Sequence, residues 1–224
     1  MRPERITHII WDWNGTLFDD IAACVGSINQ MLEQRGLATL DYERYRDIFG
    51  FPVLDFYVEV GFDLDNEDWD GLARDYHDRY LEMSRDTPLR PGSRALLQRI
   101  RTAGIPMSLL SASEQSILDD MLEHRGISSF FHRVYGLDNL HAESKLQVGR
   151  RLLADLGVEP GAALLVGDTT HDYDVASELG CRCLLMAGGH QSKPRLEACG
   201  CTVASDLDEV ERIIEDILVG KPET

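Results

Sequence analysis

Residues 6–16 read Ile-Thr-His-Ile-Ile-Trp-Asp-Trp-Asn-Gly-Thr, and this stretch decides the fold. The first six residues, which end at Trp11, are mostly β-branched or apolar, as is typical of a short buried strand. The five residues from Asp12 to Thr16 follow at once and include the turn formers Asp, Asn and Gly. We therefore predict a buried strand with the carboxylate of Asp12 at its carboxyl end. Taken alone, this pentapeptide leaves open a strand-terminating turn with a capping aspartate.

The next block, residues 19–88, has the periodicity of helices and no strand pattern. Apolar residues recur at spacings of three and four from Ile21 to Leu32, and Gly36 supplies a stop signal. We predict a separate helical unit here. Its other elements are helices over residues 42–48 and 69–83 and an aromatic loop with a glycine and a proline over residues 49–53.

Beyond residue 88, short apolar runs alternate with amphipathic stretches. Strands separated by helices of this kind pair in parallel through right-handed crossovers. The predicted fold class is α/β: a doubly wound parallel sheet core (residues 1–18 and 89–224) with an α-helical insertion (residues 19–88) after its first strand. The core strands are predicted over residues 106–110, 133–135, 163–166 and 182–186, and its helices over residues 94–103, 117–124, 146–156, 175–179 and 207–218.

Polar residues cluster where three of the predicted strands end, which is where open α/β sheets bind ligands. Asp12, Ser111 and Asp168 each follow such a strand. Asp168 opens a loop that also carries Asp172 and Asp174, and three carboxylates this close need a cation to neutralise them. Oxygen ligands of this type suit a hard divalent ion such as Mg²⁺. A solvated acidic loop is the alternative.

Several residues are ambiguous when each is taken alone. Lys145, near the start of a predicted helix, can pair with a phosphate or hold a carboxylate ionised, but a lone lysine is most often a surface residue. Ser111 alone is most often a turn residue. The five cysteines contain no Cys-x-x-Cys pair; they are Cys24, Cys181, Cys183, Cys199 and Cys201. Alternate positions on a strand point to the same face, so we interpret Cys181 and Cys183 as small buried residues rather than as part of a zinc or redox site.

The composition disfavours several classes of partner. The 224 residues carry 22 lysines and arginines against 39 aspartates and glutamates, and the formal net charge of −17 disfavours nucleic acids and anionic membranes. A small anionic substrate stays compatible, because a local cation can override the global field. No apolar run approaches the ~18–20 residues of a spanning helix, and residues 1–7 lack the features of a secretory signal. We expect a cytoplasmic protein, either a monomer or a homodimer.

Taken together, the residues at the strand ends resemble the haloacid dehalogenase superfamily of phosphohydrolases. Its four motifs occur in order, as Asp12–Thr16, Ser111, Lys145, and Gly167-Asp168 with Asp172. The resemblance covers the whole chain and implies a Rossmann-like core with an inserted α-helical cap domain, as in the phosphoglycolate phosphatase-like branch. It implies a Mg²⁺-dependent phosphatase that hydrolyses a small phosphorylated metabolite through an aspartyl phosphate. The carbon–phosphorus-cleaving branch needs a cap lysine, and residues 19–88 contain none.

The resemblance also implies a role for each matching residue. Asp12 is the implied nucleophile, and Lys145 neutralises it together with the transferring phosphate. A carboxylate that attacks an anionic phosphate needs such a cation and a metal to relieve repulsion. The implied Mg²⁺ ligands are Asp12, the backbone carbonyl of Asn14 and Asp168, with Asp172 ligating directly or orienting a bound water. The implied phosphate-binding groups are Thr16, Ser111 and the N–H groups that follow it, of Ala112 and Ser113.

Asn14 departs from the family pattern at a catalytic position. Most phosphatases of the superfamily have an aspartate there, which acts as general acid and then as base. An amide donates a hydrogen bond but cannot transfer a proton, and such acid–base help is worth ~10²–10⁴-fold in rate. Three explanations stay open: a leaving group that needs little protonation, a substitute such as His171 or a cap residue, or a slow enzyme. A catalytically weakened phosphate-binding or regulatory protein is therefore the alternative function. We interpret His190 as a loop residue rather than a catalyst.

The predicted cap offers candidates for substrate recognition. An aromatic loop beside two arginines can close over an anionic organic phosphate and exclude water. Packing of the phenylalanines within the cap is the alternative. Arg46 and Phe51 are predicted to face the substrate, and the further candidates are Arg44, Phe49, Tyr57 and Arg90.

Overall fold

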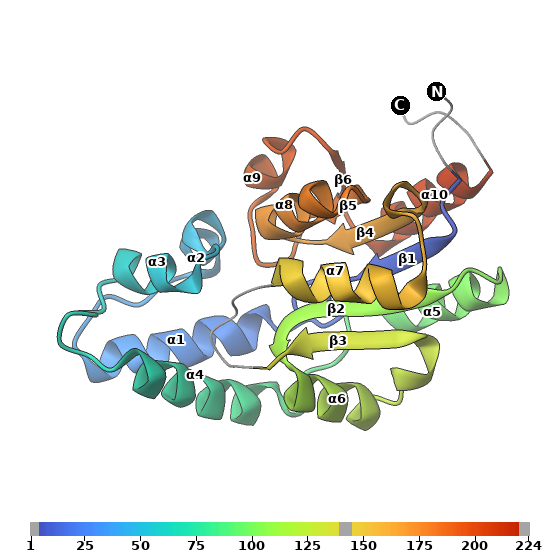
Figure 1. Cartoon of the computed structure of the whole chain (residues 1–224). Helices are drawn as coiled ribbons and strands as arrows, with labels where there is room; N and C mark the ends of the chain where they lie inside the picture. The colour runs from blue at the N-terminus through green and yellow to red at the C-terminus, as the bar shows by residue number, and fades with distance from the viewer. Residues whose placement is uncertain (1–4, 139–144, 220–224) are drawn as a thin grey trace.

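The computed structural model describes residues 5–138 and 145–219. Its core is one sheet of six parallel strands in the order β3-β2-β1-β4-β5-β6 (Figure 1). The predicted doubly wound α/β fold with an inserted helical cap is confirmed. The strands are β1 (His8–Trp11), β2 (Met107–Glu114), β3 (Arg133–Leu137), β4 (Ala163–Gly167), β5 (Arg182–Met186) and β6 (Thr202–Ala204).

β1 lies at the centre of the sheet because it pairs with β2 on one side and with β4 on the other. Ile9 lies opposite Met107 in β2 and opposite Leu164 in β4. All four residues of β1 are buried, as expected for a central strand that is apolar on both faces. Asp12 therefore leaves the sheet at the middle of its carboxyl edge.

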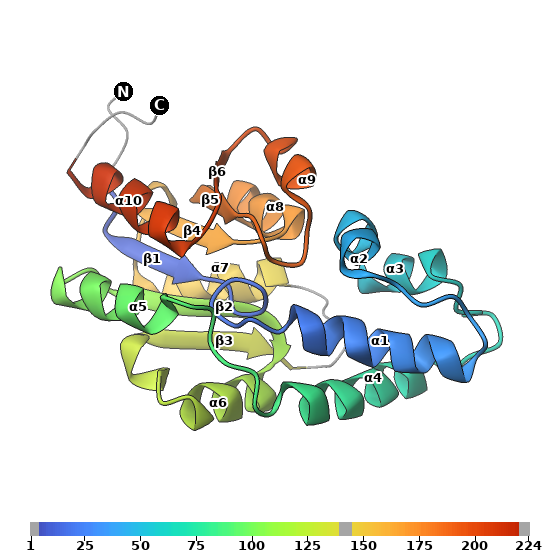
Figure 2. The same ribbon diagram turned by 180° about the vertical axis from the view of Figure 1, so that it is seen from behind.

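Helices cover both faces of the sheet, because alternate side chains of a strand point to opposite sides. Ile9 belongs to an apolar cluster with α5 (Ser93–Thr102), α6 (Gln115–His124) and α10 (Leu207–Leu218). Ile10 belongs to a second cluster with α7 (Lys145–Leu156) and α8 (Thr170–Leu179). α7 lies in front of the sheet in Figure 1, and α5 and α10 lie in front of it in Figure 2, seen from behind. The core thus has three layers. Its short helices are η1 (Ser128–Phe130), η2 (Pro160–Ala162) and α9 (Lys193–Glu197).

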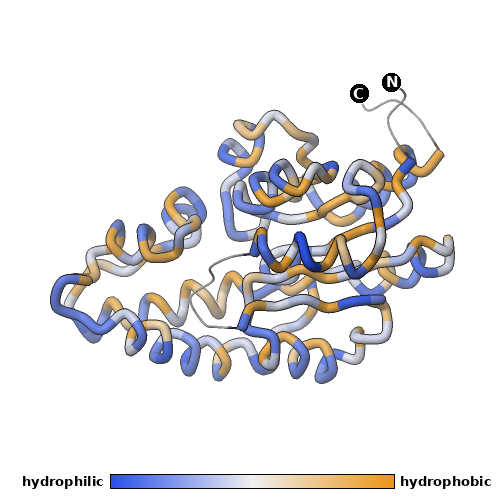
Figure 3. Tube along the Cα trace, in the orientation of Figure 1, coloured by the Kyte–Doolittle hydropathy of each residue, from blue (hydrophilic) through white to orange (hydrophobic). Residues whose placement is uncertain are grey.

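Four helices form the cap between β1 and β2, and they project to one side of the sheet (Figure 1). They are α1 (Ile21–Gln34), α2 (Tyr42–Ile48), α3 (Val53–Glu59) and α4 (Trp69–Ser84). α1 and α4 run side by side in both views (Figures 1 and 2). Apolar and hydrophilic residues alternate along these helices (Figure 3), which fits one buried and one exposed side for each helix. Across the described residues of the whole chain, no helix is both long and apolar enough to span a membrane.

The chain leaves the sheet for the cap and returns from it at neighbouring positions. Phe18 and Leu89 form an antiparallel bridge. The N–H of Arg90 donates to the carbonyl of Leu17 at 2.9 Å, and the N–H of Asp19 donates to that of Pro88 at 3.4 Å. We retain residues 19–88 as the proposed extent of the cap.

Two predicted boundaries near the strand ends are wrong. β2 runs to Glu114, so Ser111 lies inside the strand and does not follow it; it belongs to the stretch between Leu110 and Glu114 where the register with β3 shifts. α8 begins at Thr170, so Asp172 lies in its first turn and not in an acidic loop. The reason is a capping box: Thr169 accepts from the N–H of Asp172, whose carboxylate accepts from the N–H of Thr169.

Several short elements were not predicted from the sequence, among them the two 3-10 helices η1 and η2. α3 begins at Val53, inside the predicted aromatic loop, and α9 also begins close to a proline. A proline at the start of a helix is favourable, because the first N–H groups of a helix have no helical partner. The prediction of a loop at Val53, directly after such a proline, was therefore wrong. β6 has only three residues, too few for a pattern to emerge, and pairs with β5 at the sheet edge.

Candidate active site

Asp12 directly follows β1 and forms an ion pair with Lys145, the first residue described in α7. Nζ of Lys145 lies 2.6 Å from Oδ1 of Asp12 and 2.6 Å from Oδ1 of Asp172. All three side chains are buried. Residues that are 133 and 27 positions away from Lys145 in the sequence thus meet on one ammonium group. The parallel sheet brings them together, because β1 and β4 are neighbours and end at the same edge.

Asp168 directly follows β4 and faces Asp12. The hydroxyl of Thr16 donates to Oδ1 of Asp168 at 2.8 Å and to Oδ2 of Asp12 at 3.2 Å. The N–H of His190 donates to Oδ2 of Asp168 at 2.6 Å. The loop that carries Gly15 must come this close: its φ is +71°, and a Cβ there would lie 2.3 Å from Oδ2 of Asp168. Only glycine fits at this position.

Asp172 has both carboxylate oxygens engaged. Oδ1 accepts from Lys145, while Oδ2 accepts from the hydroxyl of Thr169 at 2.7 Å and from the N–H groups of Thr169 and Asp168 at 3.0 and 3.2 Å. These bonds, and Lys145 above all, hold the pKa of Asp172 below its usual range although burial acts to raise it. Asp172 is therefore ionised and keeps Lys145 in place.

The electrostatics of the site are unbalanced toward negative charge. Carboxylate oxygens of Asp12, Asp168 and Asp172 lie within 4.8 Å of one another. Burial raises the pKa of Asp12 well above its usual range, Asp172 and Asp168 add to this effect, and Lys145 only partly opposes it. Three buried carboxylates around one ammonium group can hold a further cation, and a set of hard oxygen donors suits Mg²⁺.

Asn14 is held in one orientation by three neighbours. Its Nδ2 donates to Oδ2 of Asp20 at 2.6 Å and to the hydroxyl of Tyr80, in α4, at 2.8 Å. Its Oδ1 accepts from the hydroxyl of Ser113 at 2.8 Å. The amide therefore has its donors on the cap side and its acceptor on the β2 side. Ser111 is buried, and its Oγ accepts from the N–H of Ser113 at 3.0 Å.

Asp20 and His190 form a buried ion pair that sequence reasoning missed. Nε2 of His190 lies 3.3 Å from Oδ1 of Asp20, and its Nδ1 lies 2.9 Å from the hydroxyl of Tyr45. Burial alone would lower the pKa of His190, but Asp20, followed by Asp168 and Asp12, raises it to about 9. Burial alone would raise the pKa of Asp20, but His190 and the bonds from Asn14 and Tyr80 lower it to about 2. Both groups are charged at neutral pH.

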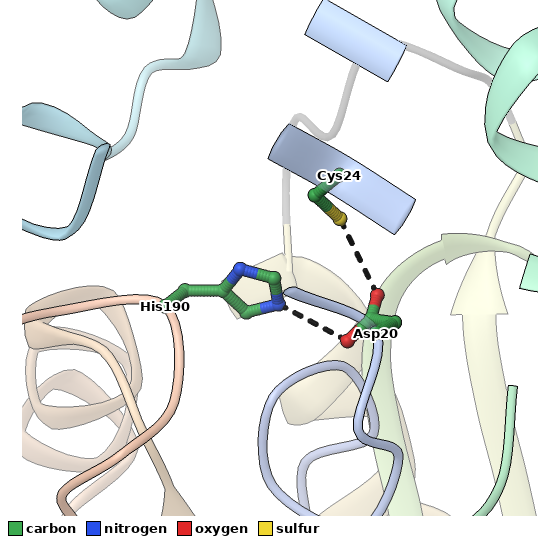
Figure 4. A group of neighbouring side chains, drawn as sticks. All are labelled: Asp20, Cys24 and His190. Carbon is green, nitrogen blue, oxygen red and sulfur yellow. Dashed lines mark hydrogen bonds and ion pairs between the residues drawn. The ribbon is translucent and has the colours of Figure 1, made fainter. Parts of the chain in front are cut away.

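Figure 4 shows Asp20 between His190 and Cys24, whose Sγ donates to Oδ2 of Asp20 at 3.5 Å. Oxygen, nitrogen and sulfur atoms so close together resemble a metal site. The oxygens of Asp20, however, already accept from Asn14, Tyr80 and the N–H of Gly15. We therefore describe this group as an ion pair with a neighbouring thiol. No sequence signal marks it, because 170 positions separate Asp20 from His190.

A pocket of about 140 Å³ lies between this site and the cap. Asp12, Asn14 and Lys145 line its sheet end, together with the predicted phosphate-binding residues Ala112 and Ser113. Thr16 and Ser111 are not among its lining residues; the hydroxyl of Thr16 bonds to the two carboxylates instead. The roles predicted for these residues in binding phosphate remain predictions.

The cap residues predicted to face the substrate divide into two groups. Phe51 lines the pocket and stacks on His171 at 4.5 Å between ring centroids, and Phe49 and Tyr57 also line it. The arginines are not among its lining residues. Their guanidinium groups bind elsewhere: Arg46 donates to the carbonyl of Gly189, Arg90 to that of Gly15, and Arg44 pairs with Glu59.

Carboxylates gathered at the carboxyl edge of a parallel sheet, below a pocket that a helical insertion covers, are typical of an α/β enzyme. The family model for haloacid dehalogenase-like hydrolases matches residues 9–186, and the chain belongs to this family. The prediction of a hydrolase of this superfamily is confirmed.

Three relatives illustrate what the chain is similar to. It is 25% identical over 205 residues to a phosphoglycolate phosphatase of Chromobacterium violaceum, which covers 88% of this chain and 92% of the relative. It is 25% identical over 209 residues to the tyrosine-protein kinase PtkA of Mycobacterium bovis, covering 92% and 71%. A solved haloacid dehalogenase-like hydrolase from Streptococcus pneumoniae has the same fold, with a TM-score of 0.81, 23% identity and coverage of 93% and 98%.

Proposed function

We propose that this protein is a Mg²⁺-dependent phosphatase that hydrolyses a small phosphorylated metabolite through an aspartyl phosphate on Asp12. One observation carries the proposal: the ammonium group of Lys145 lies 2.6 Å from both Asp12 and Asp172. A buried carboxylate at a pocket wall is thereby kept next to a cation that can also accompany an incoming phosphate. The relatives named phosphoglycolate phosphatase support the same reaction class.

The donor set supports Mg²⁺ as the cofactor. Asp12 and Asp168 would hold the ion, together with the backbone carbonyl of Asn14. Asp172 has both oxygens engaged by Lys145, Thr169 and Asp168, so we assign it to positioning Lys145. When bound, the ion supplies positive charge beside the phosphate and weakens its repulsion by Asp12.

The residues of this chain then share the work. Oδ of Asp12 attacks phosphorus, and the ester oxygen leaves with the electron pair of the broken bond. The ammonium group of Lys145 opposes the protonation of Asp12 that burial favours, and it neutralises the transferring group. Water next hydrolyses the aspartyl phosphate, so one difficult step is replaced by two easier ones. Thr16 links Asp12 and Asp168 through its hydroxyl. We assign the binding of the phosphate oxygens to Ser111, Ala112 and Ser113.

The test is phosphate release from a panel of phosphomonoesters. We expect release in Mg²⁺, its loss in EDTA, and its recovery when Mg²⁺ is restored. Acid-quenched enzyme should carry phosphate on the peptide that contains Asp12. Asp12→Asn should lose both turnover and adduct, while Asp65→Asn, which removes an exposed carboxylate of the cap, should keep both. Turnover retained by Asp12→Asn or in EDTA would reject the proposal.

A phosphate-binding or regulatory protein is the second candidate, because Asn14 cannot transfer a proton. Hydrogen bonds with Asp20, Tyr80 and Ser113 fix the amide of Asn14 at the position where most related phosphatases have a proton-donating aspartate. Tight binding of inorganic phosphate without turnover of any panel member would favour this function. Turnover with an aspartyl phosphate would favour the phosphatase.

A further inference from the structure

The cap end of the pocket is a wall of aromatic rings. The rings contact one another: the centroids of Tyr45 and Phe49 lie 5.0 Å apart, and those of Tyr57 and Trp69 lie 5.1 Å apart at 89°. Rings packed in stacked and edge-to-face pairs form a rigid apolar surface that favours another ring. The aromatic residues of this wall are Tyr45, Phe49, Phe51, Phe56, Tyr57, Trp69, Tyr76 and Tyr80.

The cap end of the pocket has few cationic side chains that could bind a second anionic group of the substrate. Within residues 5–138 and 145–219, the basic side chains that line the pocket are Lys145 and three histidines, and no arginine lines it. Lys145 is bound between two carboxylates, and His190 is paired with Asp20. The rings of His171 and His77 pack on aromatic neighbours, Phe51 and Tyr76. A substrate carboxylate placed among the aromatic rings would lose its water without gaining a paired cation, which is costly. This end of the pocket therefore favours a substrate whose non-phosphate part is neutral.

The size of the pocket limits the neutral part of the substrate. The pocket has a volume of about 140 Å³, and this includes its sheet end, where Asp12, Asn14 and Lys145 line it. An apolar cavity of about 150 Å³ in another protein takes up benzene, so the room left beside a phosphate admits one small ring at most. A nucleoside or a second ring exceeds it.

Asn14 points to the same class of substrate by an independent argument. Its two N–H groups donate to Asp20 and Tyr80, and an amide has no proton to transfer to a leaving oxygen. An alkoxide needs that proton, because its parent alcohol is about as weak an acid as water, with a pKa of about 15.7. A phenolate needs it far less, because the pKa of a phenol is about 10.

We propose that the substrate class of this site is the phosphate monoester of a small neutral phenol, with its ring against the aromatic wall of the cap. This inference rests on the proposed phosphatase function and deepens it. Oδ of Asp12 forms the bond to phosphorus, the bond from phosphorus to the aryl oxygen breaks, and its electron pair leaves on the phenolate, which takes a proton from bulk water. Water then attacks phosphorus, the electron pair of the bond to Asp12 returns to the carboxylate, and the water's proton leaves to solvent.

Three substrates measured with Mg²⁺ separate the arguments. Phenyl phosphate carries the ring and the acidic leaving group, benzyl phosphate carries the ring on an alkyl oxygen, and phosphoglycolate carries a carboxylate and no ring. We expect kcat/KM to fall at least 100-fold from phenyl to benzyl phosphate, which is the low end of what acid catalysis supplies, and to be lower still for phosphoglycolate. Phosphoglycolate or benzyl phosphate turned over as fast as phenyl phosphate overturns the inference and leaves the phosphatase standing. No turnover of any phosphomonoester overturns the proposed function itself.

Variants at position 14 test the leaving-group argument. Asn14→Asp supplies a proton donor, so it should raise kcat/KM for benzyl phosphate about 10-fold or more relative to phenyl phosphate. Because the new carboxylate would face Asp20, the double variant Asn14→Asp with Asp20→Asn is made as well. His171→Asn removes the other titratable side chain that stacks on the wall. A selective loss of benzyl phosphate turnover in His171→Asn would show that an acid is already present and would overturn this argument.

Inhibitors test the ring site without any turnover. Phenylphosphonate should bind at least tenfold more tightly than methylphosphonate, and phosphonoacetate should bind no better than methylphosphonate. Val53 lines the pocket and is half-buried, so Val53→Arg can bring a cation to the wall. It should improve phosphonoacetate binding, whereas Val53→Met, similar in reach and uncharged, should not. Stronger binding of phosphonoacetate than of phenylphosphonate to the unmodified protein would overturn the inference, whether or not the variants fold.

Discussion

The two ends of the pocket are built in different ways. At the sheet end, every functional side chain is fixed by hydrogen bonds or ion pairs: Lys145 bridges Asp12 and Asp172, and Thr16 bridges Asp12 and Asp168. At the cap end, aromatic rings hold one another by packing. Directional bonds position atoms for a reaction, while packed rings select a shape and a polarity. We therefore expect changes at the sheet end to act on the rate and changes at the cap end to act on substrate preference.

The largest effect is expected from Lys145→Met. It removes the ammonium group that opposes protonation of the buried Asp12 carboxylate, so a smaller share of Asp12 is in its nucleophilic form. We expect kcat/KM to fall on the order of 10³-fold or more. Lys193→Met is the control, because Lys193 pairs with Glu197 on the surface. A loss below tenfold would show that the sheet end does not depend on this ion pair.

Asn14→Asp should give the next largest effect, on stability. The new carboxylate would face Oδ2 of Asp20, to which Nδ2 of Asn14 now donates at 2.6 Å. Two buried like charges at this distance should reduce the free energy of unfolding by about 4 kcal/mol at pH 8. Asp20→Asn in the same chain should recover at least half of the loss in a double-mutant cycle of denaturant unfolding curves. Losses that simply add would contradict direct contact between the two positions.

The Asp20–His190 ion pair, which lies between the sheet end and the cap end, predicts that the free energy of unfolding depends on pH. Folding raises the pKa of His190 from 6.5 to about 9, so the folded state binds this proton more tightly than the unfolded state. The stabilisation is complete below pH 6.5 and is lost as the pH rises through about 9, by on the order of 3 kcal/mol. Denaturant unfolding in EDTA from pH 6 to 10 measures it. His190→Gln should flatten this slope, and His124→Gln, which removes an exposed histidine, should leave it unchanged.

The smallest effect is expected from Phe51→Leu at the cap end. The substitution shortens the stack on His171 but keeps the wall apolar. KM for an aromatic phosphate should rise less than tenfold, about 1 kcal/mol, with kcat nearly unchanged. Leu54→Ala, at an exposed position in the neighbouring helix α3, should change neither constant. A large fall in kcat for Phe51→Leu would mean that the cap end also positions the reacting atoms.

The same division explains how much could be predicted from the sequence. Asp12 and Asp168 were predicted correctly at the strand ends, because a short apolar run followed by a polar residue marks the carboxyl edge of a buried strand. Lys145 was predicted correctly at a helix start. These positions depend on local patterns, and the sheet then brings them together.

The cap end depends on contacts between residues that are distant in the sequence. Periodicity predicts α2, but it does not show that Arg46 turns to the carbonyl of Gly189, 143 positions later, while Phe51 turns to the pocket. The same holds for Asp20 and His190, whose partners become evident only when the cap is seated on the core. The residues at the sheet end of the pocket were therefore more predictable from the sequence than the contacts at its cap end.

The bridge between Phe18 and Leu89 joins the two points at which the cap is connected to the core, so the cap can be exchanged as one segment. The two chain segments that connect the cap to the core lie side by side, so the insertion begins and ends at neighbouring positions. The entropic cost of inserting such a closed segment into the core fold is small. A different set of helices joined at these two peptides would present a new wall to an unaltered sheet edge. Replacing one contiguous stretch of chain, residues 19–88, would thus change the surface that contacts the substrate. Asp12, Lys145 and Asp168 lie outside this stretch and would stay in place.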